Sequence, residues 1–225
     1  MKIKSDFYII PITIILILII PIYCFLLSSM NPQIKERYTF SIFILIVAIE
    51  RLWETFFSTS QQERRRYKIY GDWTLAVVSM LYVTLGFLKI TEFFYVKRDV
   101  NVLTVLFSTM LFCYAFALRW LSIKALGKQW TVHAVGAQKI SKVRLLKIGP
   151  YKYIRHPIYL GVILELISFS IIFNTYYSFI FCLVFNLPMQ IIRTFVEEKT
   201  SIRKFGDIYL KYKRETPAFI PKIKI

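Results

Sequence analysis

The stretch of sequence best suited to chemistry is 149–161, which reads Gly-Pro-Tyr-Lys-Tyr-Ile-Arg-His-Pro-Ile-Tyr-Leu-Gly. Its opening Gly-Pro pair is typical of a loop, and Pro157 suits the first turn of a helix, where its missing N–H costs nothing. We therefore expect Arg155 and His156 at a helix N-terminus. Backbone donors, the helix dipole and a guanidinium converge there, which predicts a site for an anionic group such as a ligand carboxylate.

The same stretch is rich in tyrosine, with Tyr151, Tyr153 and Tyr159. These side chains would add aromatic faces and hydroxyls to a binding site. The alternative is structural, because tyrosine and arginine are also enriched where a helix enters a membrane. Both interpretations place this stretch at the end of a membrane-spanning helix.

A second group of reactive side chains, Arg193, Glu197 and Glu198, lies about 40 residues later. Arg193 and Glu197 are four residues apart and so share a helix face. Carboxylates near a helix C-terminus oppose its dipole, which suggests a specific role, although solvation at a helix end is the alternative. The short turn 174–177 predicts an antiparallel hairpin that returns this group to the membrane depth of His156, so both segments should line one pocket.

Apolar stretches long enough to cross a bilayer provide the scaffold for these side chains. The chain has 225 residues, of which 56% are hydrophobic, and residues 7–27 contain no charge. Such composition excludes disorder and disfavours a soluble enzyme. We count six stretches, at about 7–27, 38–57, 73–94, 100–121, 157–174 and 176–196. The expected fold is all-α, a polytopic transmembrane helical bundle with about five or six spans.

The net charge of +17 first suggests nucleic acid, but its distribution indicates membrane topology instead. The N-terminal tail, the segments 58–72 and 122–156, and the tail after 196 together hold 22 Lys and Arg. The alternate loops hold four, at Lys35, Arg37, Lys97 and Arg98. The positive-inside rule then places both termini in the cytoplasm, and the basic excess would contact anionic membrane lipids. We predict no nucleic-acid partner and no metal, since the three cysteines lie in apolar stretches without CxxC spacing.

An ionisable residue within a predicted span costs a few kcal/mol unless it is paired or faces a polar cavity, and the candidates are Glu50, Arg51, Glu54, Arg119, Glu165 and Arg193. Arg51 and Glu54 are one turn apart and could pair locally, and Glu50 precedes them. Arg119 is expected to extend to the cytoplasmic surface. Glu165 lies too deep for that, so we expect it to be paired, protonated or lining a pocket.

The tail 198–213 carries apolar side chains at helical spacing, Ile202, Phe205, Tyr209 and Tyr212, with lysine and arginine between them. This pattern predicts a C-terminal helix that lies on the membrane surface and partly covers the pocket.

Taken together, these motifs resemble the isoprenylcysteine carboxyl methyltransferase (ICMT) family of integral membrane enzymes. The resemblance covers roughly 125–221 and includes Gly-x-Tyr-x-x-x-Arg-His-Pro-x-Tyr-x-Gly, the Glu-Glu pair and Phe-Gly-x-x-Tyr-x-x-Tyr after it. Within the family, the chain looks closest to the bacterial branch associated with type III polyketide synthases. The residues that carry this narrower likeness are Arg51, Glu54, Ser58, Glu165 and Asn186.

The resemblance implies S-adenosylmethionine as cofactor, bound in a cytoplasmic cofactor pocket, and a hydrophobic, lipid-like methyl acceptor. The implied cofactor-binding residues are Val143, Arg144, Leu145, Leu146, Tyr151, Arg155, His156, Pro157, Tyr159, Glu197 and Glu198. The implied catalytic residues are Arg193 and Glu197. The implied acceptor-binding residues are Arg193, Glu165, Asn186, Arg51 and Glu54.

We accordingly expect N-terminal transmembrane helices over residues 1–121 and an ICMT-like catalytic region over 122–225. The expected reaction is methyl transfer to a carboxyl, enol or phenol oxygen of the acceptor, in a bacterial cytoplasmic membrane. Alternatives are N-methylation of a phospholipid or amine, a membrane sterol reductase, which usually has more spans, and a non-catalytic scaffold that retains the fold.

Overall fold

The computed structural model describes residues 6–56, 73–96, 101–130 and 144–221, and all regular structure within these ranges is helical. The all-α expectation is therefore confirmed. The long helices are α1 (Asp6–Met30), α2 (Arg37–Phe56), α4 (Trp73–Tyr95), α5 (Val102–Leu126), α6 (Pro157–Ile172) and α8 (Leu187–Phe205). The shorter elements are η1 (Gly127–Gln129), η3 (Gly149–Lys152), α7 (Tyr176–Phe181), the π-helix η4 (Cys182–Asn186) and α9 (Asp207–Glu215).

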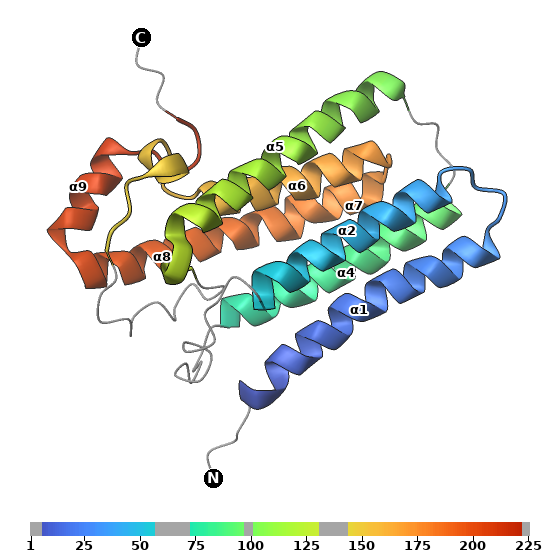
Figure 1. The fold of residues 1–225 in the computed structure, drawn as a ribbon, viewed down its shortest axis with the longest axis horizontal. Helices are drawn as coiled ribbons and strands as arrows, with labels where there is room; N and C mark the ends of the chain where they lie inside the picture. Colours follow the sequence, from blue (N-terminus) through green and yellow to red (C-terminus); the bar gives the residue numbers. More distant parts are fainter. Residues whose placement is uncertain (1–5, 57–72, 97–100, 131–143, 222–225) are drawn as a thin grey trace.

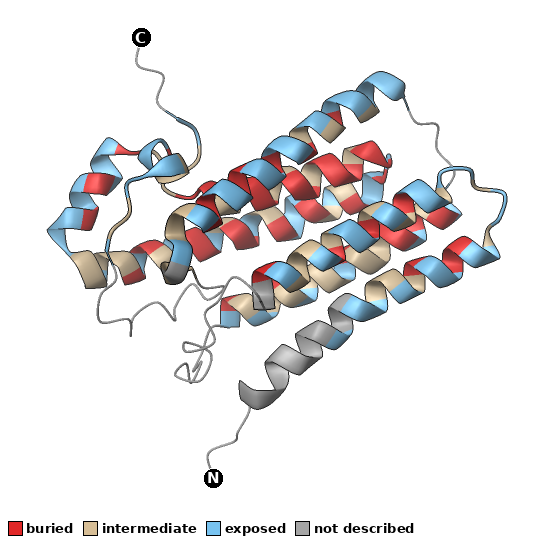
Figure 2. Cartoon of the chain, in the orientation of Figure 1, coloured by how far each residue is buried: buried red, intermediate tan, exposed pale blue. Residues whose placement is uncertain are grey.

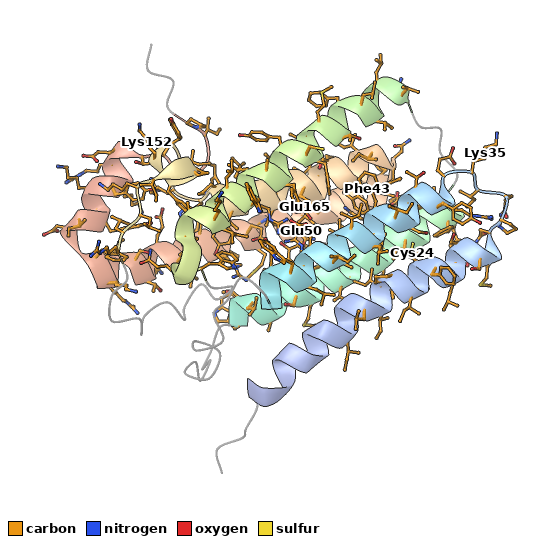
Figure 3. All side chains as sticks on the ribbon, viewed as in Figure 1. Cys24, Lys35, Phe43, Glu50, Lys152 and Glu165 are labelled. Atoms are coloured by element: carbon orange, nitrogen blue, oxygen red, sulfur yellow. The ribbon has the colours of Figure 1, made fainter. Side chains whose placement is uncertain are left out.

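The long helices lie roughly side by side (Figure 1). The α1–α2 and α6–α7 turns, the end of α4 and the start of α5 lie at one end of the bundle. The end of α2, the start of α6, η3 and the end of α8 lie at the other. Lys35 and Lys152 mark these two ends (Figure 3). This alternation is the arrangement that the sequence predicts for the basic and the basic-poor segments.

Each of the six apolar stretches coincides with a helix. Three helices, Trp73–Tyr95, Val102–Leu126 and Tyr176–Phe205, are long and apolar enough to cross a membrane, and Leu18–Met30 and Pro157–Ile172 are shorter apolar helices. The outward faces carry large exposed side chains such as Leu103, Phe107 and Met110 of α5, and Figure 2 shows these faces as exposed while buried residues lie between the helices. Such an exposed apolar surface identifies a membrane protein.

Local sequence explains where the helices begin and end. The Asn101 side chain accepts hydrogen bonds from the Leu103 and Thr104 amides at the start of α5. The α6–α7 hairpin depends on Glu92 of α4, whose carboxylate accepts the backbone N–H of Tyr177 at 2.9 Å and of Ser178 at 2.8 Å. A carboxylate from one helix thus satisfies the N-terminal donors of another.

The C-terminal region differs from the single surface helix expected over 198–213. Helix α8 continues through Phe205 and ends at Gly206, whose φ of 54° is a conformation that glycine adopts without strain. Helix α9 then begins at Asp207 and turns back along the end of the bundle (Figure 1). Tyr209 and Tyr212 are buried beneath α9, so this helix packs on protein through the residues that the pattern had identified.

The aromatic core occupies the end of the bundle away from η3. Phe40 of α2 stacks on Phe93 of α4, with ring centroids 3.9 Å apart, and meets Phe173, at the end of α6, edge to face at 4.8 Å. Such ring pairs add to the stabilisation from burial alone. The apolar contacts at this end fix the helices around the Glu92 carboxylate, and the buried arginines lie farther along the bundle toward η3.

Candidate functional site

Four side chains converge where α6 begins and α8 ends. His156 lies directly before α6 and is 3% exposed, and its Nε2 is 3.1 Å from Oε1 of Glu198 on α8. Arg155 donates to the same oxygen from Nε at 2.9 Å and from Nη2 at 2.7 Å. The Nζ of Lys213 on α9 is 2.6 Å from Oε2 of Glu198. The predicted convergence of the two segments is therefore observed, with Glu198 as the direct partner of the imidazole.

The residues after α9 complete this end of α6. Arg155 Nη1 donates to the carbonyl oxygens of Lys213, at 3.0 Å, and of Thr216. The backbone N–H groups of Arg155 and His156 donate to the carbonyls of Pro217, at 2.9 Å, and Ala218, at 3.0 Å. Protein groups thus occupy the Arg155 donors, for which the sequence predicted an anionic ligand. Arg155 holds the C-terminal segment across the helix start.

The imidazole of His156 keeps one atom available. A carboxylate oxygen only accepts hydrogen bonds, so Nε2 of His156 carries the proton in its contact with Glu198. The other ring nitrogen, Nδ1, is buried and has no hydrogen-bond partner among the described residues. Arg155 and Lys213 also bond to Glu198. The buried Nδ1 of His156 is therefore the ring atom that remains open to a hydrogen bond with a ligand.

A second group of side chains lies beside the imidazole. Tyr159, in the first turn of α6, has its ring 5.8 Å from that of His156, and its hydroxyl interacts with both Arg193 and Glu197 of α8. The guanidinium carbon of Arg193 lies 5.8 Å from the Tyr159 ring centroid. Tyr159 therefore joins the two α8 residues that the sequence placed on one helix face.

Two buried tyrosines at this end of the bundle, Tyr151 and Tyr212, are held in their neutral form. Burial, and after it the Glu197 carboxylate, raises the pKa of Tyr151 well above its ordinary value. Burial likewise raises the pKa of Tyr212 to about 12, and its hydroxyl donates to the Tyr151 carbonyl at 2.6 Å. Tyr151 thus presents a neutral phenol next to Glu197, while Tyr212 fixes its backbone.

A second cluster of charged groups lies deeper in the bundle and ties three helices together. Arg51 of α2 is 3.1 Å from Glu54 and 2.6 Å from Glu165 of α6. Arg119 of α5 is 2.9 Å from Glu50 and also pairs with Glu54 and Glu165. Figure 3 shows Glu50 and Glu165 close together within the bundle. The expectations that Arg51 pairs with Glu54 and that Glu165 is paired are confirmed.

The expectation for Arg119 is wrong. Its side chain is 1% exposed and points between the helices instead of reaching the surface. Gly161 provides the space, because a Cβ there would overlap the Arg119 Cγ and lie 3.0 Å from the Ala115 carbonyl oxygen. An arginine that extends to the membrane surface is stabilised by water, whereas Arg119 is stabilised by pairing with three carboxylates.

The remaining predicted residues are more scattered. Val143 and Ser58 lie outside the described residues. Arg144 opens an extended segment, and its backbone N–H donates to Gln129 Oε1 at 2.7 Å; Leu145 and Leu146 are half-buried in that segment. Asn186 is buried at the end of the π-helix.

Sequence reasoning missed several residues that the structure joins to these groups. Lys213 pairs with Glu198, and the Tyr82 hydroxyl of α4 accepts a hydrogen bond from Gln190 of α8 at 2.9 Å. The Tyr82 ring also lies 5.3 Å from the guanidinium carbon of Arg51. A signal existed for Gln190, which lies one turn after Asn186 and one turn before Arg193 within an apolar stretch. Within the described ranges, no group of three or more His, Cys, Asp or Glu side chains is arranged to hold a metal ion.

The sequence model of the isoprenylcysteine carboxyl methyltransferase (ICMT) family matches residues 107–203. This part of the chain belongs to the ICMT family. The ICMT segment begins within α5 and ends near the end of α8, so it contains Arg119, His156, Glu165 and Glu198.

The chain is also similar to a bacterial protein. It is 29% identical over 82 residues to a protein named "Uncharacterized protein YpbQ" from Bacillus subtilis (strain 168), a match that covers 36% of this chain and 47% of that protein. The chain therefore matches about half the length of this relative. The relative's name assigns it no activity, so this similarity indicates no function.

Proposed function

We propose that the protein is an integral membrane methyltransferase that uses S-adenosylmethionine and methylates an oxygen of a hydrophobic, lipid-like acceptor. The observation that carries the proposal is the meeting of His156 and Tyr159, at the start of α6, with Arg193, Glu197 and Glu198 of α8. These groups lie at one end of a bundle whose flanking segments are basic, and the ICMT family match spans both helices. The positive-inside rule makes this the cytoplasmic end.

The side chains present suit the proposed cofactor. The buried Nδ1 of His156, which has no partner among the described residues, is positioned to hydrogen-bond a polar group of S-adenosylmethionine. Glu197 and the neutral ring of Tyr151 offer a negative charge and an aromatic face to its positive groups. Arg155 and Glu198 would act indirectly, because they bond to each other and hold the C-terminal segment. When bound, S-adenosylmethionine supplies an electrophilic methyl group on a positively charged sulfur.

The protein's own contribution would be alignment and exclusion of water. Arg193 is buried beside Tyr159, where a guanidinium favours the deprotonated form of an acceptor oxygen and orients it. Tyr159 and Glu197 hold Arg193 in place. The segment after α9 covers the start of α6 and would shelter the bound reactants from water. Fixing both reactants in one geometry is worth several orders of magnitude in rate.

The acceptor would enter from the bilayer. The outer faces of the helices carry exposed apolar side chains and would contact lipid. The charged cluster around Glu165 lies inside the bundle next to Tyr82 and Gln190. The narrower sequence likeness favours enol or phenol oxygens over carboxylates, so we propose base-stable methyl ethers as products.

Methyl transfer can be tested directly. Purified protein is incubated with methyl-labelled S-adenosylmethionine and a lipid extract of its host, and labelled products are identified by mass spectrometry. We expect a labelled, base-stable methyl ether, and a Glu197→Ala variant should not produce it. Base-labile methyl esters would instead indicate carboxyl methylation, and labelled amines N-methylation. Absence of labelled product together with absence of cofactor binding would favour the scaffold alternative.

A further inference from the structure

Asn186, which the family resemblance places on the acceptor side, is a buried polar side chain to which the proposed chemistry gives no specific partner. It is 1% exposed, and neither Nδ2 nor Oδ1 has a hydrogen-bond partner among the described residues. An amide buried without partners is costly, and more so between membrane-spanning helices, where bulk water does not compensate. Such a group usually indicates a ligand or a bound water.

The backbone at this position is also unusual. Residues 182–186 form a π-helix, and the Leu187 N–H donates to the Cys182 carbonyl. Short π-helical segments inside α-helices are rare and often lie at functional sites. The extra residue in this turn changes the direction in which Asn186 and the residues after it project. The sequence thus combines an irregular helix with an unpartnered amide at one position.

Neighbouring contacts locate Asn186 within a seam between α4 and the α7–α8 segment, where polar groups lie beside apolar side chains such as Leu85 and Phe181. One turn toward the cytoplasmic end, Gln190 donates to Tyr82. One turn the other way, Cys182 lies near Lys89, a buried lysine that donates to the Leu166 carbonyl at 3.2 Å. Asn186 is therefore bracketed by two cross-helix contacts.

The seam leads to the proposed reaction site. Asn186, Gln190 and Arg193 follow at spacings of four and three residues and so share one face of α8. Asn186 lies seven residues, or about 10 Å of helix rise, below Arg193. A lipid-like acceptor that places its reacting oxygen at Arg193 from the bilayer side would extend along this face toward Asn186.

We propose that Asn186 determines acceptor specificity by hydrogen-bonding a second, uncharged oxygen function of the acceptor, a hydroxyl or carbonyl apart from the oxygen that is methylated. The neutral amide supports an uncharged group, because it offers one acceptor and two donors without charge. This inference rests on the proposed function, since the acceptor is the molecule expected to reach the seam.

The test uses two compounds that differ by one hydroxyl, 4-dodecylphenol and 4-(5-hydroxydodecyl)phenol, whose second oxygen lies about 10 Å from the phenol oxygen in the extended chain, as the helix rise from Arg193 to Asn186 requires. Their affinities for the protein in lipid nanodiscs are measured without cofactor and corrected for partition into empty nanodiscs. We expect wild-type protein to bind the hydroxylated compound about tenfold more tightly. Asn186→Leu, which has similar volume, should abolish that preference, and the control Met189→Leu, also on α8, should retain it.

Equal wild-type affinity for the two compounds would overturn the proposal without any variant, as would an Asn186→Leu protein that keeps the preference. The second result would mean that the amide bonds only to water. Because binding is measured without turnover, it is separable from the proposed reaction. If the preference depends on Asn186 but neither compound accepts a labelled methyl group, the binding site stands and methyl transfer to such acceptors is refuted.

Discussion

Arg119 and Arg155 are both arginines bonded to carboxylates, but their surroundings differ. Arg119 of α5 points toward α2 and α6, where it pairs with the carboxylates of Glu50, Glu54 and Glu165. Arg155 lies at the end of the bundle and divides its donors between Glu198 and backbone carbonyls of the C-terminal segment. The first cluster compensates charge with charge, whereas the second connects chain segments.

The difference follows from the environment of each cluster. Between membrane-spanning helices no bulk water surrounds a charge, so the carboxylates of Glu50, Glu54 and Glu165 compensate Arg51 and Arg119. At the end of the bundle where α6 begins, the network differs, because His156 Nδ1 has no partner among the described residues. We therefore assign the Arg119 cluster mainly to architecture and the His156 region to ligand binding.

The largest loss of stability is expected from removing a carboxylate of the Arg119 cluster. Glu165→Ala removes the carboxylate that bonds to both Arg51 and Arg119 and leaves the buried guanidinium donors that faced it without a partner, although Glu50 and Glu54 still balance the two charges. We expect a loss of about 3–5 kcal/mol in the free energy of unfolding, measured by reversible denaturation in mixed micelles. The matched variant from the other region is Lys213→Ala, whose exposed ammonium should contribute about 1 kcal/mol or less. Similar losses for both variants would contradict the distinction between the clusters.

A smaller effect is expected where Arg155 connects the C-terminal segment to α6. Arg155→Lys keeps the charge but cannot bridge Glu198 and two carbonyls at once. We expect it to destabilise the docking of α9 by about 1.5–3 kcal/mol, because hydrogen bonds to a charged group are lost. Limited proteolysis should then cut after α8 at least tenfold faster while the helical bundle stays intact. Unchanged cleavage would mean that other contacts hold the segment.

The smallest effect concerns Tyr212, whose hydroxyl donates to the Tyr151 carbonyl. Tyr212→Phe should cost about 0.5–1.5 kcal/mol at neutral pH. The pKa of Tyr212 is raised to about 12 in the folded protein, so the unfolded chain loses this proton first as pH rises. Wild-type stability should therefore fall between about pH 10 and pH 12. A Tyr212→Phe protein with the same decrease over that range would rule out this assignment.

Sequence patterns predicted the helical architecture well because apolar stretches of membrane length have few alternative structures. They also predicted that His156 meets the acidic end of α8, since a four-residue turn permits only a hairpin. Partner choice was harder. Glu197 and Glu198 are adjacent, and only the rotation of α8 about its axis directs one to Tyr159 and the other to His156.

The inward direction of the Arg119 side chain could not be predicted from residue spacing either. Its position near the end of a span suits a snorkelling side chain, and the inward direction depends on space at Gly161, 42 residues later. The same limit applies to Arg155, whose partners lie in the C-terminal segment. In each case the deciding contact joins parts of the chain whose separation no local pattern encodes.

Cofactor binding tests the central claim most directly, namely that the start of α6 and the end of α8 form one site for one S-adenosylmethionine molecule. Isothermal titration calorimetry should give one site per chain for wild-type protein. His156→Ala and Glu197→Ala should each weaken binding at least tenfold, whereas Lys35→Ala at the opposite end of the bundle (Figure 3) should leave it unchanged. Wild-type affinity in both site variants would contradict the account.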